Sequence, residues 1–213
     1  DTMVVGQVVG VEALAALGAV DFLMWVVTGI STGLTQGFSI QLSQYYGAKD
    51  FENLRKSLAH SYRLTAFIAA GVLILSQSFA SLVLTGLHTP SNIIGMSLLY
   101  LRIIFCGIPA TAAYNMFASA LRAMGNSKTP LTAMIIASVL NVSLDILFVA
   151  GFGWGVAGAA IATVIAQSFS AVYCFLILRR IDIVHLTRAD FMPASGMNAR
   201  LMKPVSYTHL TLP

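Results

Sequence analysis

The most constraining feature of this sequence is a series of long, mostly apolar runs separated by short polar loops. A helix needs about 20 consecutive apolar residues to cross a bilayer, whereas a barrel strand needs about ten residues of alternating polarity. The runs approach or exceed the helical length without alternation, so we expect membrane-spanning helices. The five runs cover residues 17–44, 58–84, 93–121, 130–148 and 156–178, and residues 1–9 resemble the end of another helix.

Composition agrees with a chain whose solvent is mostly lipid. Only 9% of the 213 residues are charged and 57% are hydrophobic, whereas a soluble globular domain has roughly 25% charged residues. This excludes an ordinary cytosolic enzyme, a disordered tail and a small disulfide-stapled module. The expected fold class is therefore all-α, a polytopic membrane helix bundle. Cys106 and Cys174 fall in apolar runs without metal-ligand spacing, and we interpret both as small buried thiols.

The basic residues alternate between loops in a way that predicts a topology. Eleven of the twelve lysines and arginines follow the second, fourth or sixth span, and Arg102 alone breaks the pattern. Cytoplasmic loops carry the excess of basic residues in membrane proteins. The loops without basic residues are 10–16, 86–92 and 150–155. The loops that we place in the cytoplasm are 45–57, 122–129 and 179–204.

We expect three segments along the chain. Residues 1–180 form a six-helix bundle whose first helix is incomplete, because the sequence begins at Asp1 with no basic leader before the first apolar run. Residues 181–204 form a polar linker on the cytoplasmic surface. Residues 205–213 match neither a helix face nor the start of another span, and we interpret them as a non-native tail. The chain is thus expected to be part of a longer protein.

Ionisable side chains within a span are candidates for function, because lipid solvates charge poorly. The strongest candidate is Asp145, deep in its span, with Asn141 one turn earlier on the same helix face. Their oxygens could hold a sodium ion, or the aspartate could act as a proton carrier. A buried aspartate that only fixes helix packing is the alternative. Asp21 and Arg102 lie near the outer interface, and we expect structural roles for both.

Neutral polar residues and motifs add less specific information. Gln36, Asn115 and Gln167 either line a cavity or join helices by hydrogen bonds. Pro109 should bend the fourth span. No serine-hydrolase, zinc-protease, Walker or dinucleotide-binding motif occurs in context, so we expect neither enzymatic activity nor a cofactor. Without an ATP-binding element, any uphill transport must draw on an ion gradient.

Five stretches of the sequence look familiar when they are taken together. They are D-T-M-V-V-G with G-V-E-A-L-A-A-L-G at 1–18, T-Q-G with S-Q-Y-Y-G-A-K-D at 35–50, L-R-A-M-G-N-S-K-T-P at 121–130, N-V-S-L-D at 141–145 and G-V-A-G-A-A-I-A-T at 155–163. In this order and spacing they resemble the multidrug and toxic compound extrusion (MATE) family over residues 1–180. The resemblance implies the N-terminal lobe of a twelve-helix antiporter, in which two six-helix bundles face a central cavity.

The resemblance also implies a function and a site. Family members couple the entry of sodium ions or protons to the export of cationic, often aromatic, drugs. In part of the family, a site in this bundle uses residues that match Asp1, Asn141, Asp145 and Thr163. The implied coupling ion is Na⁺ or H⁺, with no other metal. The implied partners are the lipid bilayer, small cationic or aromatic substrates and a second bundle, but no nucleic acid, in the bacterial inner (plasma) membrane.

Two other functional classes remain open at this stage. A lipid-linked oligosaccharide flippase of the same superfamily would need basic residues in its cavity to meet a pyrophosphate. Arg102 alone is available within the spans, which argues against a flippase. A non-transporting scaffold or an intramembrane enzyme would leave Asn141 and Asp145 unexplained. A cation-coupled antiporter that works by alternating access is therefore the preferred hypothesis.

Overall fold

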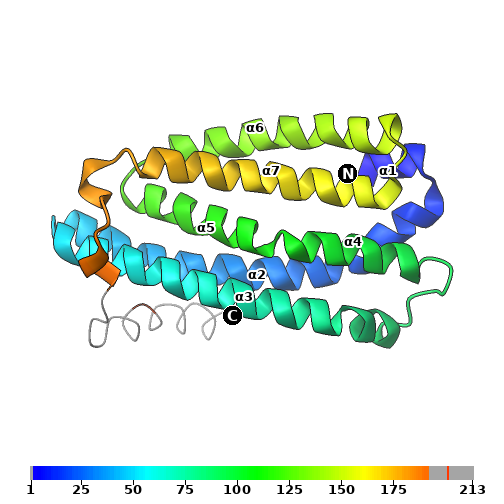
Figure 1. Ribbon diagram of the computed structural model, residues 1–213, viewed down its shortest axis with the longest axis horizontal. Helices are drawn as coiled ribbons and strands as arrows, with labels where there is room; N and C mark the ends of the chain where they lie inside the picture. The colour runs from blue at the N-terminus through cyan, green and yellow to red at the C-terminus, as the bar shows by residue number, and fades with distance from the viewer. Residues whose placement is uncertain (1, 192–200, 202–213) are drawn as a thin grey trace, which may run out of the picture.

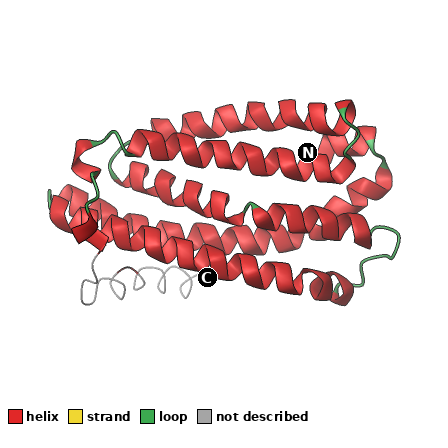
Figure 2. Cartoon of the chain, viewed as in Figure 1, coloured by secondary structure: helices red, strands yellow, loops and turns green. Residues whose placement is uncertain are grey.

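The computed structural model of the chain describes residues 2–191 and 201. Throughout this part of the chain, the regular elements are helices, most of which run antiparallel along one long axis (Figures 1 and 2). The expected all-α bundle is therefore confirmed. The elements are α1 (Thr2–Val8), α2 (Val11–Gly47), α3 (Phe51–Gly86), α4 (Ile94–Cys106), α5 (Ile108–Ala123), α6 (Lys128–Asp145), the π-helix η1 (Ile146–Gly151), α7 (Gly155–Leu178), and the 3-10 helices η2 (Asp182–Val184) and η3 (Arg188–Phe191).

After the short α1, the described helices provide up to five spans by length and apolar composition. Four of the spans are long and apolar enough by themselves to cross a membrane, and α4 with α5 makes the fifth as a bent pair. The connections that carry basic residues lie at one end of the bundle, on the left in Figure 1. The connections α1–α2, α3–α4 and η1–α7 lie at the other end. This is the alternation that the basic residues predict.

Two predicted loops are helical instead. The loop expected over 10–16 is confined to Val9 and Gly10, and α2 already begins at Val11. Gly10 has a φ of 113°, which favours glycine at this turn. The charged loop expected over 45–57 is also mostly helical, and only residues 48–50 connect α2 to α3. Asp50 accepts a hydrogen bond from the Asn53 N–H at 3.2 Å and caps α3. At the starts of α2 and α3, polar residues indicate where the apolar part of the helix begins and not where the helix itself begins.

The predicted bend in the fourth span is present. The axes of α4 and α5 differ by 43° at a break around Gly107. Pro109 lies in the first turn of α5, where the missing N–H costs no helical hydrogen bond. At Gly107 an added Cβ would lie 2.8 Å from Cγ2 of Val164, so a side chain there would collide with α7. The bend therefore coincides with a close approach between two spans.

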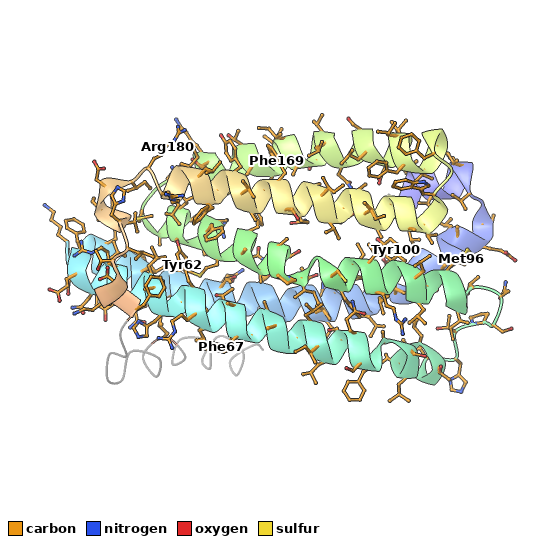
Figure 3. The ribbon with its side chains drawn as sticks, in the orientation of Figure 1. Tyr62, Phe67, Met96, Tyr100, Phe169 and Arg180 are labelled. Carbon is orange, nitrogen blue, oxygen red and sulfur yellow. The ribbon has the colours of Figure 1, made fainter. Side chains whose placement is uncertain are left out.

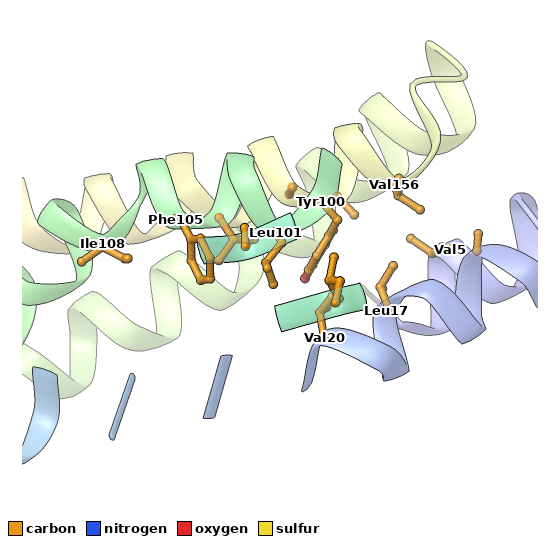
Figure 4. Packing of buried hydrophobic residues seen from close by; sticks show 14 of the residues in the cluster. Val5, Leu17, Val20, Tyr100, Leu101, Phe105, Ile108 and Val156 are labelled. Atoms are coloured by element: carbon orange, nitrogen blue, oxygen red, sulfur yellow. The ribbon is translucent and has the colours of Figure 1, made fainter. Parts of the chain in front are cut away.

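Buried side chains form two separate clusters, one toward each end of the bundle. The outer cluster contains Tyr100, Leu101 and Phe105 of α4 together with side chains of α1, α2 and α7 (Figure 4). The inner cluster lies near the basic loops and includes Phe38 and Leu121. The pair α4–α5 packs against α2, α3 and α7 and occupies the centre of the fold. The outward surface is apolar, as expected for helices that face lipid.

One local expectation is wrong. Cys174 is buried as predicted, but Cys106 is exposed on α4, where its Sγ accepts a hydrogen bond from Gln77 Nε2 at 3.3 Å. Further along the chain, Gly151 is the last residue of η1. Positive φ angles occur after it, at Gly153 and Gly155, which form the turn into α7.

The segment after α7 folds back onto the start of α3. Asp190 is 5% exposed and lies 3.9 Å from Nε of Arg55, and Arg63 Nη1 donates to the Phe191 carbonyl at 3.0 Å. Thr187 donates to Asp190 Oδ2 through its N–H at 2.7 Å and its hydroxyl at 2.8 Å. We call these contacts the linker clasp. Burial acts to raise the pKa of Asp190, but the Thr187 bonds and nearby Arg55 and Lys56 hold that pKa below its usual value.

The rest of the predicted linker and tail, residues 192–200 and 202–213, lies outside the described part of the chain. The proposed end of the linker at residue 204 and the non-native origin of residues 205–213 therefore stay predictions.

Candidate functional site

The predicted site residues of the α6–α7 pair meet in the structure. Asn141 Nδ2 of α6 donates a hydrogen bond to Oγ1 of Thr163 on α7 at 3.3 Å. The Thr163 hydroxyl in turn donates to the Ala159 carbonyl of its own helix at 3.1 Å. Both side chains are half-buried. The contact therefore joins the two spans through polar atoms. The amide oxygen of Asn141 takes part in neither of these two hydrogen bonds.

Asp145 lies one turn beyond Asn141, at the last residue of α6. It is wholly buried, with 0% of its surface exposed. The helix then changes to the π-helix η1. This geometry is rare in proteins, and where it occurs it is often at a functional site. Close packing encloses this region, since a Cβ added to Gly158 of α7 would lie 3.0 Å from Cβ of Phe148. A carboxylate is thus held inside the outer half of the bundle, where desolvation makes its charge costly.

Tyr100 is a neighbour of the site that the sequence did not single out. Tyr100 is a buried residue of α4 and is labelled in Figures 3 and 4. The carboxylates of Asp21 and Asp145 are near enough to act electrostatically on its hydroxyl. One tyrosine in an apolar run carries no signal of such a neighbour, so sequence reasoning could not have found it. Asp21 and Arg102 are both exposed.

Asn141 and Thr163 also line a partly polar cavity of about 160 Å³ between α6 and α7. Of the three predicted cavity residues, Gln167 lines it, but Gln36 and Asn115 do not. Gln36 is exposed on α2, and Asn115 is half-buried on α5. The residues that line the cavity are Tyr114, Met134, Ala137, Ser138, Asn141, Thr163, Ala166, Gln167 and Ser170.

The polar lining residues that were missed have a recognisable spacing. Ser138 precedes Asn141 by three residues, and Ser170 follows Thr163 by seven, so each serine shares a helix face with a predicted site residue. Counting helical turns from the predicted residues Asn141 and Thr163 could therefore have identified both serines. Tyr114 reaches the same cavity from α5, and its hydroxyl donates to the Pro130 carbonyl at 3.4 Å.

The fourth predicted residue, Asp1, lies outside the described part of the chain. The helix that follows it, α1, packs against η1 and α7. Among the described residues, no three His, Cys, Asp or Glu side chains are grouped as metal ligands. The carboxylate, amide and hydroxyl oxygens of Asp145, Asn141 and Thr163 are instead the ligand types that suit a hard cation or a proton.

Comparison with known proteins places this geometry in context. The family model described as MatE matches residues 1–147. The chain is 33% identical over 180 residues to the probable multidrug resistance protein YoeA of Bacillus subtilis strain 168, and 32% identical over 173 residues to the probable multidrug resistance protein YpnP of the same strain. These matches cover 83% and 81% of this chain but 38% and 39% of the relatives. The chain therefore spans about two fifths of their length.

Solved structures share the fold. The crystal structure of MATE in the bent conformation matches with a TM-score of 0.92 at 24% identity, covering 98% of this chain and 47% of that one. An inward-facing conformation of a multidrug resistance MATE family transporter matches with a TM-score of 0.90 at 23% identity, covering 96% of this chain and 47% of that one. An outward-facing conformation matches with a TM-score of 0.89 at 24% identity, covering 98% and 47%.

Proposed function

Because the chain belongs to the MatE family of multi-pass membrane transporters, we propose that the protein containing it is a cation-coupled antiporter. It would export small cationic or aromatic molecules by alternating access. The observation that carries this proposal is the wholly buried Asp145 one turn from the hydrogen-bonded Asn141–Thr163 pair. The printed names of the relatives YoeA and YpnP, probable multidrug resistance proteins, support the substrate class.

The coupling step follows from the cost of a buried charge. Burial makes the charged form of a carboxylate less stable than it is in water, so binding of a proton or a cation at Asp145 offsets part of that cost. A sodium ion would gain oxygens from Asn141 and Thr163, whereas a proton would need only the carboxylate. Binding and release of either ion would change the α6–α7 contact. The ion would drive transport to the extent that it binds the two conformations of the bundle with different affinity.

The remaining parts of the transporter would come from outside this chain. We propose that a second bundle completes the central cavity and that Asp1 contributes a second carboxylate to the site. The proposed location is the bacterial inner membrane, with the basic loops in the cytoplasm. Among the residues that the structure describes, no lysine or arginine lines the polar cavity, so this cavity offers no basic group to a pyrophosphate and the flippase alternative is not favoured.

Transport by reconstituted protein tests this proposal. The complete protein would be placed in vesicles with an imposed sodium or pH gradient, and export of the cationic dye ethidium would be followed by fluorescence. Asp145→Asn keeps the size of the side chain but cannot carry the charge, so it should reduce gradient-driven export to the level of empty vesicles. Asp21→Asn, a matched change of an exposed carboxylate, should leave export unchanged.

Three outcomes would contradict the proposal. They are export by Asp145→Asn at the wild-type rate, equal loss in Asp21→Asn, and export that neither gradient stimulates.

A further inference from the structure

A second cavity, which we call the slot, is separate from the polar one; it runs between α3 and α5 and reaches α7 at Phe175. It has a volume of about 390 Å³ and a nearly apolar lining. Both α3 and α7 pack against α5. Small side chains on the facing helices keep it open, namely Ala66, Ala69, Ala70, Ala112 and Ala113. Its size falls in the range of sites that hold organic ligands.

The slot opens onto the lipid-facing surface in the half of the bundle nearer the basic loops. Ala66 and Ala70 on its edge are exposed, and the neighbouring Phe67 and Ile74 of α3 are 72% and 65% exposed (Figure 3). The slot extends from Tyr62, next to the charged start of α3, to Pro109 at the α4–α5 bend. With the basic loops in the cytoplasm, this depth corresponds to the cytoplasmic leaflet.

Aromatic rings close the end of the slot at the membrane boundary and support a cation there. The ring centroid of Phe117 lies 5.5 Å from that of Tyr62 and 5.3 Å from that of Phe175. The guanidinium of Arg179 lies over the Phe175 ring at 5.6 Å. Within the described residues, no carboxylate lies within ion-pair distance of Arg179, and Asp182 pairs instead with His185 at 3.7 Å. An exposed positive charge therefore remains beside the aromatic end of the slot. The slot thus presents, from the boundary inward, a cation and an apolar channel.

We propose that this slot binds one anionic phospholipid of the cytoplasmic leaflet. Its phosphate would meet Arg179, and one acyl chain would lie in the slot between α3 and α5. Anionic lipids are concentrated in the cytoplasmic leaflet, where basic residues attract them. An acyl chain gains little hydrophobic energy by leaving the bilayer for an apolar slot. Selectivity should therefore reside in the charge of the headgroup.

Native mass spectrometry of the complete protein in detergent tests this proposal. The protein would be titrated with phosphatidylglycerol and, separately, with phosphatidylcholine of the same acyl chains. We expect one phosphatidylglycerol to be retained in preference to phosphatidylcholine. Arg179→Gln should weaken the binding of phosphatidylglycerol about fivefold and leave phosphatidylcholine unchanged, as expected for the loss of one basic contact.

Matched variants separate the slot from the general surface. Ala70→Phe fills the slot from its exposed edge and should abolish the preferential site, whereas Ile74→Phe, one turn away and outside the lining, should not. Arg180→Gln removes the adjacent charge and should have little effect.

The proposal is overturned if Arg179→Gln binds phosphatidylglycerol as the wild type does, or if both lipids are retained equally. It is also overturned if Ala70→Phe keeps the site while folding normally. Circular dichroism and gel filtration establish folding for each variant.

Discussion

The hydroxyl of Thr163 does two things at the contact between α6 and α7. It donates to the Ala159 carbonyl and accepts from the Asn141 amide. Thr163→Val removes the acceptor but keeps the branched shape, so the half-buried amide of Asn141 loses its partner. We expect a loss of about 1 kcal/mol in the free energy of unfolding. We also expect a higher ion concentration for half-maximal export, measured in vesicles.

Thr163→Ser is the matched control, because it keeps the hydroxyl and should keep the ion dependence. If Thr163→Val left both the stability and the ion dependence unchanged, the contact would have no role in either.

At the scale of elements, the linker clasp makes the docking of η2 and η3 onto α3 sensitive to acid. The pKa of Asp190 is lower in the folded protein than its ordinary value of 3.8. Its stabilising contribution is therefore fully present above pH 3.8 and is lost as the pH falls through the lowered value. Asp190→Asn should speed hydrogen exchange of the Thr187 amide about tenfold or more at neutral pH, because hydrogen bonds to charged groups contribute about 1.5–3 kcal/mol.

Exchange rates would be compared with the intrinsic rate at each pH. Asp182→Asn, a fully exposed carboxylate, is the control and should leave Thr187 protected. Protection of Thr187 in Asp190→Asn equal to that of the wild type would show that the clasp does not hold the linker.

At the scale of the whole molecule, two exposed serines at opposite ends of the bundle report its orientation. Ser91 lies between α3 and α4, and Ser127 lies between α5 and α6. In a background with Cys106→Ser and Cys174→Ser, Ser91→Cys should react with a membrane-impermeant thiol reagent in intact cells. Ser127→Cys should react only after permeabilisation. The reverse pattern, or equal labelling of both, would contradict the orientation assigned from the basic loops.

The sequence predicts features that depend on one strong physical rule. Apolar length identifies the spans, basic residues predict the arrangement of loops, and the ring of Pro109 predicts the bend. It does not predict that α2 begins at Val11, because nothing in the composition distinguishes a helix that extends past the membrane boundary from a polar loop. For the same reason, the sequence does not predict that the charged first turns of α3 are helical.

For the candidate site, too, the sequence predicts some of the residues and not others. Asn141, Asp145 and Thr163 are recognisable because polar residues are costly in a span and because the motifs resemble a family. Tyr100 becomes visible only when α4 is packed against the rest of the bundle. The change from α-helix to π-helix after Asp145 also has no signature in the residues around it.

The division of the buried side chains into two clusters has a mechanical consequence. On α7 the outer cluster ends at Ala160 and the inner one resumes at Cys174. Thr163 and Gln167 fall in the interval between them, where polar and small side chains replace interlocked apolar ones. On α5, by contrast, the two clusters are only one turn apart, at Ala112 and Met116. An ion that binds between α6 and α7 would therefore act on the side of the bundle where the least apolar packing has to be broken.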